Sequence, residues 1–129
     1  MKLRKEQIEA FSAAAKAEFE DRMVKHLNEF FPRHCKAMGE EGVRQEIRHG
    51  VARARTYEIT SQRDVCKYID LAFVYGRDFD TNPKLPWAGR ILNDPSFINA
   101  SERTSELFET GREFLQKNPR ASQKIGKGR

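Results

Sequence analysis

The segment from Tyr68 to Tyr75, YIDLAFVY, is the feature that most limits how this chain can fold. With the residues before it, it predicts a helix over 61–75 whose second half is apolar on nearly every side. A helix without a polar face is normally the buried centre of a bundle, because any exposed face would place apolar side chains in water. The sequence therefore predicts an all-α fold with helix 61–75 at its centre.

Further helices are expected on both sides of this segment. The first should run from Arg4 to Phe30, because apolar residues recur there at three- and four-residue steps. Its apolar stripe consists of Ile8, Phe11, Ala15, Phe19, Met23, Leu27 and Phe30. Others are expected over 33–38 and 40–57, separated by Gly39, then a short helix from Pro86 and a last one over 99–117. Residues 1–117 should thus form one domain of five or six helices, without a β-sheet.

Two helix starts carry local capping signals. Ser61 (or Thr60) precedes the central helix, and Asp64 follows three residues after Ser61. Asn99 and Glu102 have the same spacing before the last helix. Side-chain oxygens at such positions accept hydrogen bonds from backbone N–H groups that have no partner inside the helix.

The net charge of +5 is concentrated at one end of the chain. From residue 117 onward there are five basic residues and no acid: Lys117, Arg120, Lys124, Lys127 and Arg129. The other 19 basic residues are balanced by 19 acids. The helical body is therefore formally neutral, which argues against a nucleic-acid-binding face on the body. We expect residues 118–129 to form a flexible basic tail.

Neither a membrane segment nor a signal peptide is expected. No apolar run approaches the roughly 20 residues that span a bilayer. Acids such as Glu6 and Glu9 interrupt the N-terminal residues, so they lack a continuous apolar stretch. The two cysteines, Cys35 and Cys66, are expected to be reduced thiols in a cytoplasmic protein.

One short motif is similar to a calcium-binding loop. Asp78, Asp80 and Asn82 occupy the first, third and fifth positions of such a loop. The sixth position is Pro83 where glycine is needed, and the twelfth is Gly89 where a bidentate glutamate is needed. We expect turns in a polar loop over 77–86 instead of a calcium site.

The histidines and cysteines form no local metal or catalytic motif. His26, His34, Cys35, His49 and Cys66 include no Cys-x-x-Cys, His-x-x-x-His or His-Glu-x-x-His spacing. No local signature pairs a nucleophile with a base either. We therefore predict no metal, no cofactor and no enzymatic activity.

Asp70 lies inside the most apolar stretch of the chain. An unpaired carboxylate there would be very costly to bury, so a partner is expected. The predicted partner is a tyrosine hydroxyl or one of three arginines, Arg44, Arg48 or Arg55. A structural salt bridge is the favoured interpretation, and a functional carboxylate is the alternative.

A partner-binding surface is predicted from six further residues: Arg48, Arg55, Arg77, Asp78, Asp80 and Trp87. Trp87 follows a proline-rich loop, where it would either contact a partner or pack the loop onto the core. The basic residues Arg44, Arg48, Arg53, Arg55, Arg63 and Lys67 are interleaved with acids, which favours an ordinary solvated face over a basic patch.

The stretch from Ile59 to Trp87, ITSQRDVCKYIDLAFVYGRDFDTNPKLPW, resembles a family of small helical proteins associated with type VI secretion gene clusters of Gram-negative bacteria. The likeness extends upstream to residues 47–50 and covers about half the chain. It implies a cytoplasmic bacterial protein that binds a secreted effector or spike component as adaptor, chaperone or immunity factor. We therefore expect a non-catalytic protein-binding module. The alternative is a nucleic-acid-associated protein that uses the basic tail and the arginine-rich helix over 40–57.

Overall fold

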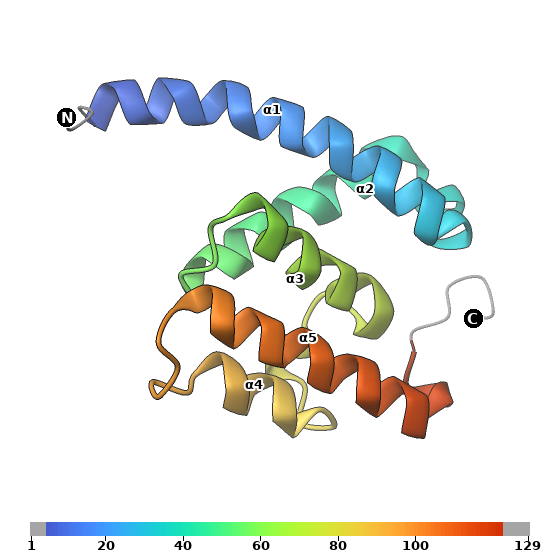
Figure 1. Ribbon diagram of the computed structural model, residues 1–129. Helices are drawn as coiled ribbons and strands as arrows, with labels where there is room; N and C mark the ends of the chain where they lie inside the picture. Colours follow the sequence, from blue (N-terminus) through green and yellow to red (C-terminus); the bar gives the residue numbers. More distant parts are fainter. Residues whose placement is uncertain (1–4, 123–129) are drawn as a thin grey trace.

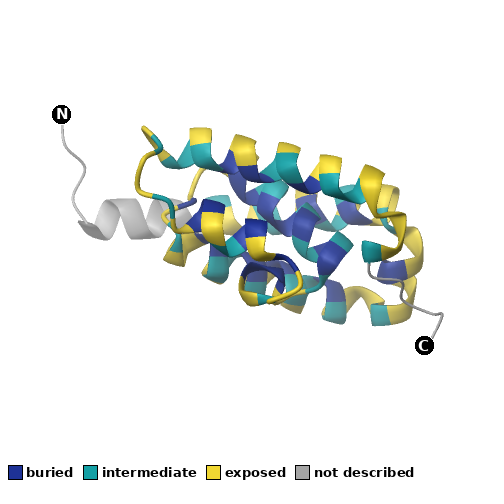
Figure 2. Ribbon diagram, turned by 90° about the horizontal axis from the view of Figure 1, so that it is seen from below, coloured by how far each residue is buried: buried dark blue, intermediate teal, exposed yellow. Residues whose placement is uncertain are grey.

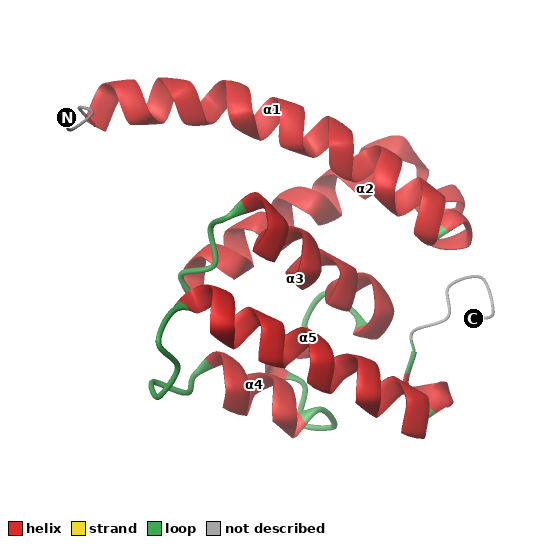
Figure 3. Cartoon of the chain, viewed as in Figure 1, coloured by secondary structure: helices red, strands yellow, loops and turns green. Residues whose placement is uncertain are grey.

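The computed structural model describes residues 5–122, with side chains from Ala14 onward, and consists of helices (Figure 1). The α-helices are α1 (Lys5–Phe30), α2 (Pro32–Thr56), α3 (Gln62–Tyr75), α4 (Pro86–Leu92) and α5 (Ala100–Lys117). Two short 3-10 helices are η1 (Phe79–Thr81) and η2 (Pro119–Ala121). No strand occurs among the described residues (Figure 3). The predicted all-α single domain is confirmed.

Helix α3 lies between two helix pairs. It packs against α1 and α2 on one side and against α5 on the other, where α5 also packs on α4 (Figure 1). Half of its 14 residues are buried: Asp64, Val65, Tyr68, Ile69, Leu71, Phe73 and Tyr75. Figure 2 shows the buried residues between the helices and the exposed ones on the outer faces. The predicted central position of this helix is confirmed.

Helix α2 bends at Gly39. This glycine has φ +77° and ψ 163°, a conformation that side chains other than glycine rarely adopt. The predicted break between two helices is therefore confirmed, because Gly39 has non-helical dihedral angles and separates the two parts of α2. Beyond it, α2 approaches α3 closely at Gly50, where a Cβ would lie 2.7 Å from Cγ1 of Ile69. This contact fixes which face of α3 meets α2.

Both predicted capping signals are confirmed. Ser61 Oγ accepts a hydrogen bond from the Asp64 backbone N–H at 3.2 Å. Asn99 Oδ1 accepts one from the Glu102 N–H at 2.8 Å. Glu102 in turn accepts one from the N–H of Ile98 at 2.9 Å. These local bonds set where α3 and α5 begin.

Trp87 of α4 packs against both α3 and α5. Its ring lies 5.5 Å from Tyr75 of α3 and 5.7 Å from Phe114 of α5, centroid to centroid. Gly111 allows this approach, because a Cβ there would lie 2.8 Å from Leu71 and 3.2 Å from Trp87. Trp87 is thus buried and packs the loop onto the core, the second of its two predicted roles. It is not an exposed recognition residue.

Three boundary expectations need correction or restriction. The loop over 77–86 is not wholly polar, because Phe79 of η1 and Leu85 are buried in the core. The apolar stripe of α1 stops before Phe30, which is 61% exposed. The tail predicted from residue 118 begins with the ordered turn η2, whose Ala121 packs against the core. Residues 123–129, and the side chains of Ile8 and Phe11, lie outside the described residues.

No helix within residues 5–122 is long and apolar enough to cross a bilayer.

Candidate functional site

The six residues predicted to bind a partner do not form one surface. Arg48 and Arg55 lie on α2 and line a groove described below. Arg77 and Asp78 are exposed in the turn after α3, and Arg77 lies 3.5 Å from Glu46. Asp80, like Trp87, is buried. The exposed residues of the predicted set are therefore Arg48, Arg55, Arg77 and Asp78.

Asp80 is the most deeply buried carboxylate in an ion pair of the described structure, with a side chain that is 0% exposed. It accepts hydrogen bonds from the guanidinium of Arg53 and from the hydroxyl of Tyr57, the latter at 2.7 Å. Burial, followed by this hydrogen bond, raises the pKa of Tyr57 to about 12. Asp80 is thus held inside the fold and does not face the turn as a calcium ligand would.

Asp70 has a different partner from those predicted. Its carboxylate oxygens lie 2.9 and 3.2 Å from Nε2 of His26 on α1. Arg44 and Arg48 instead pair with Glu20. The reason is the orientation of α3: Ile69 faces α2 at Gly50, which turns the next residue toward α1. The side chain is also 21% exposed, so its burial is partial.

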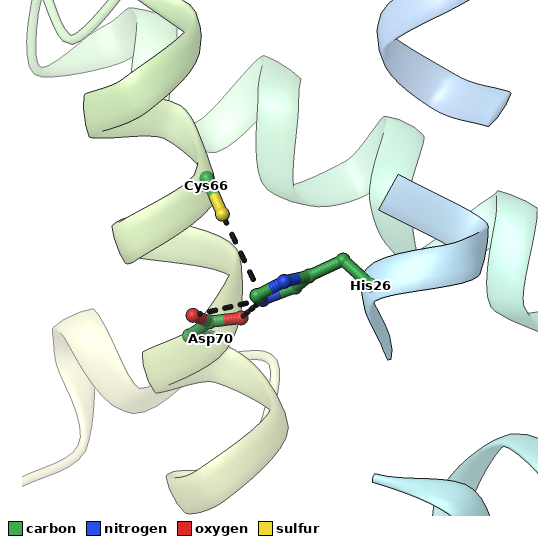
Figure 4. A group of neighbouring side chains, drawn as sticks. All are labelled: His26, Cys66 and Asp70. Carbon is green, nitrogen blue, oxygen red and sulfur yellow. Dashed lines mark hydrogen bonds and ion pairs between the residues drawn. The ribbon is translucent and has the colours of Figure 1, made fainter. Parts of the chain in front are cut away.

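Cys66 completes a cluster of three ligand-type side chains between α1 and α3 (Figure 4). Its Sγ lies 3.7 Å from His26 Nε2, and one donor atom of each residue, including Asp70, lies within 4.8 Å of the other two. Cys66 and Asp70 are four residues apart and therefore share one face of α3. His26 reaches them from the neighbouring helix. The fold thus brings His26 together with Cys66 and Asp70, which lie 40 and 44 residues further along the chain.

The cluster does not have the geometry of a cysteine–histidine catalytic pair oriented by a carboxylate. In such a triad the two ring nitrogens serve different neighbours, one the nucleophile and the other the carboxylate. Here Nε2 of His26 faces both Cys66 and Asp70. Burial, followed by the nearby Asp70 charge, also raises the pKa of Cys66 to about 11. A neutral thiol is a poor nucleophile at ordinary pH.

Burial raises the pKa of Asp70 as well, and the hydrogen bond with His26 opposes this increase.

Local sequence motifs do not reveal this cluster, because its side chains come from different helices. The one available signal was the spacing of Cys66 and Asp70, which places a thiol and a carboxylate on one helical face. The identity of the third side chain depends on how α1 packs against α3. The sequence pattern does not contain that information.

A separate groove of about 610 Å³ lies between α1, α2 and the start of α3. Its apolar lining comes from all three helices: Ala15, Phe19, Ile47, Val51, Ala52 and Val65. Its polar lining consists of Lys16, Glu20, Arg48, Arg55, Thr60 and Gln62. An apolar floor with a few polar groups is typical of sites that bind a ligand or a peptide.

The charges at this groove are mostly positive. Glu20 accepts hydrogen bonds from Arg48 at 2.9 Å and from Arg44 at 2.7 Å, which lower its pKa. Its negative charge is therefore already balanced. Lys16 and Arg55 are exposed and form no ion pair with any described side chain. The groove thus combines an apolar floor with two rim cations, Lys16 and Arg55, that have no carboxylate partner among the described side chains.

Comparison of the chain with models of protein families, with curated protein sequences and with solved protein structures found no match.

Proposed function

We propose that this chain is a non-catalytic protein-binding module that receives a segment of another protein in the groove between α1, α2 and α3. The observation that carries the proposal is the combination of apolar floor and cationic rim described above. Apolar side chains of a partner would enter between Phe19, Ile47 and Val51. Burial of apolar surface supplies most of the stability of such complexes, and charge complementarity sets orientation and specificity.

The rim indicates the chemistry of the bound segment. Lys16 and Arg55 are exposed at the rim, and neither pairs with a carboxylate among the described side chains. A complementary segment would be amphipathic, with apolar residues on one face and aspartate or glutamate beside them. Among segments of this kind, an amphipathic helix fits a groove formed by three helices. The resemblance of Ile59–Trp87 to type VI secretion-associated proteins suggests a secreted effector or spike component as the source.

The alternative nucleic-acid function receives less support from the arrangement of the arginines. Arg44 and Arg48 of α2 share Glu20, and Arg53 is bound to the buried Asp80. Guanidinium groups already neutralised by carboxylates contribute little to phosphate binding, which depends on uncompensated positive charge. We therefore do not propose a nucleic-acid function for α2.

A pair of photo-crosslinking variants tests the proposal in the source cells. Ala52 and Ala37 are both exposed alanines of α2, but only Ala52 lines the groove. A photoreactive amino acid is placed at one or the other position, and the irradiated products are identified by mass spectrometry. We expect a protein adduct from position 52 that is absent from position 37.

A second change connects this adduct to the charge of the rim. Arg55→Glu should abolish the adduct from position 52 while leaving the circular dichroism spectrum and melting temperature of the chain unchanged. Equal adducts from both positions, or an adduct that survives Arg55→Glu, would contradict the groove as the binding site. Recovery of nucleic acid alone, lost steeply as salt is raised, would favour the alternative function.

A further inference from the structure

The cluster of His26, Cys66 and Asp70 has the donor atoms of a transition-metal site. An imidazole nitrogen, a thiol sulfur and a carboxylate oxygen converge on one point between α1 and α3 (Figure 4). These are the three ligand types that bind Zn²⁺ in proteins. Ca²⁺ and Mg²⁺ prefer sites made of oxygen ligands, so the sulfur and nitrogen here disfavour both.

The distances from His26 Nε2 to the sulfur and to the carboxylate oxygens are close to those around a tetrahedral ion. Zn–S and Zn–N bonds of about 2.3 and 2.0 Å place the sulfur and nitrogen about 3.6 Å apart at a tetrahedral angle. In this structure Cys66 Sγ and His26 Nε2 are 3.7 Å apart. Zinc bonds to nitrogen and oxygen of about 2.0–2.1 Å place these two atoms about 3.3 Å apart. The observed distances from Nε2 to the Asp70 oxygens are 2.9 and 3.2 Å.

We propose that His26, Cys66 and Asp70 bind Zn²⁺ through Nε2, Sγ and a carboxylate oxygen. Three protein ligands leave one of four positions for water or an external ligand. Solvent can reach the site, since the side chains of His26 and Asp70 are 29% and 21% exposed. The ion would connect α1 to α3 across residues that are distant in sequence. This proposal is independent of the function proposed for the groove.

Cobalt provides a direct test, because Co²⁺ occupies zinc sites and reports its ligands by absorption. The full chain, freed of metal with a chelator, is titrated with Co²⁺. We expect a thiolate-to-cobalt charge-transfer band and intense tetrahedral d–d bands, both removed when Zn²⁺ is added. Zn²⁺ should also raise the melting temperature by several degrees, since a ligand that binds the folded state stabilises it. Ca²⁺ should have neither effect.

Single variants assign the ligands. Cys66→Ser should abolish the charge-transfer band, whereas Cys35→Ser should retain it, because Cys35 is buried on α2 and is not a member of the cluster. Asp70→Asn and His26→Gln should weaken Co²⁺ binding by more than the roughly 10- to 100-fold typical of outer-shell changes. Circular dichroism of each variant, without metal, separates loss of binding from loss of fold. If Cys66→Ser fails to fold, Asp70→Asn, which keeps the side-chain volume, decides the question.

Three results would overturn the proposal. The first is the absence of a charge-transfer band in the parent protein. The second is a band that persists in Cys66→Ser but is lost in Cys35→Ser, which would place the metal beside His34. The third is unchanged affinity in a folded Asp70→Asn variant together with unchanged affinity in a folded His26→Gln variant.

Discussion

Loss of either partner of the buried ion pair between Arg53 and Asp80 should have unequal consequences. The Asp80 side chain is fully buried, whereas that of Arg53 is 34% exposed. Replacing Arg53 with Met would leave a carboxylate in the interior with the Tyr57 hydroxyl as its remaining observed donor. Replacing Asp80 with Asn would leave a guanidinium that can still reach water at its exposed part.

The magnitudes follow from this difference in exposure. Removing one partner of a buried ion pair costs about 3–5 kcal/mol of unfolding free energy, and Arg53→Met should fall in this range. Asp80→Asn keeps the side-chain volume and one acceptor oxygen, so it should cost about 1–2 kcal/mol. The double variant should be more stable than Arg53→Met alone, because no unpaired charge remains buried.

Urea unfolding followed by circular dichroism measures these differences. With a dependence of about 1–3 kcal/mol per molar urea, Arg53→Met should lower the midpoint by about 1 M or more. Arg112→Met is the matched control, since Arg112 pairs with Glu109 at 2.7 Å on the exposed surface of α5. That change should cost less than about 1 kcal/mol. A loss of unfolding free energy in Arg53→Met no larger than in the control, or a larger loss in Asp80→Asn than in Arg53→Met, would contradict this expectation.

Three further outcomes are expected. Gly50→Ala should lower the unfolding free energy by about 1–2 kcal/mol, because the added Cβ would lie 2.7 Å from Ile69 Cγ1. This loss is expected even though alanine favours helices by about 1 kcal/mol over glycine. A raised melting temperature would contradict the expectation. Ser61→Ala should cost about 0.5–2 kcal/mol through loss of the α3 cap, measured by thermal unfolding, whereas no loss would mean that the cap is dispensable. Burial raises the pKa of Cys66 to about 11. In a Cys35→Ser variant, the rate of its reaction with an aromatic disulfide should therefore keep rising about tenfold per pH unit beyond pH 9. Free cysteine, with a pKa of about 8.5, levels off there. A plateau at the lower pH would disprove the raised pKa.

Features that depend on near neighbours in the chain were predictable from the sequence. The apolar pattern of 61–75 predicted a central helix, because a helix without a polar face has to be covered by others. The capping positions at Ser61 and Asn99 were predictable because a cap bonds to an N–H two or three residues later. Gly39 marked the bend of α2 for the same local reason, since glycine permits a positive φ.

The identity of each buried polar contact required the tertiary structure. The same pattern that placed Asp70 on a central helix did not fix how that helix is rotated between its neighbours. Close packing at Gly50 turns Asp70 toward His26. Two of the three arginines expected to bind it, Arg44 and Arg48, pair with Glu20 instead. An arginine and a tyrosine do meet a carboxylate, but at Asp80, through Arg53 and Tyr57.

The sequence by itself therefore determined that this chain is helical, which helix is central and where the helices begin. Only the tertiary structure decided that His26 meets Cys66 and Asp70, and that Arg48 and Arg55 flank an apolar groove. The physical reason is the distance along the chain between the residues that interact. Helical periodicity and capping involve residues within about four positions of one another. The rotation of each helix is set by contacts between residues much farther apart, such as Gly50 with Ile69 and His26 with Asp70. A one-dimensional pattern does not contain that packing.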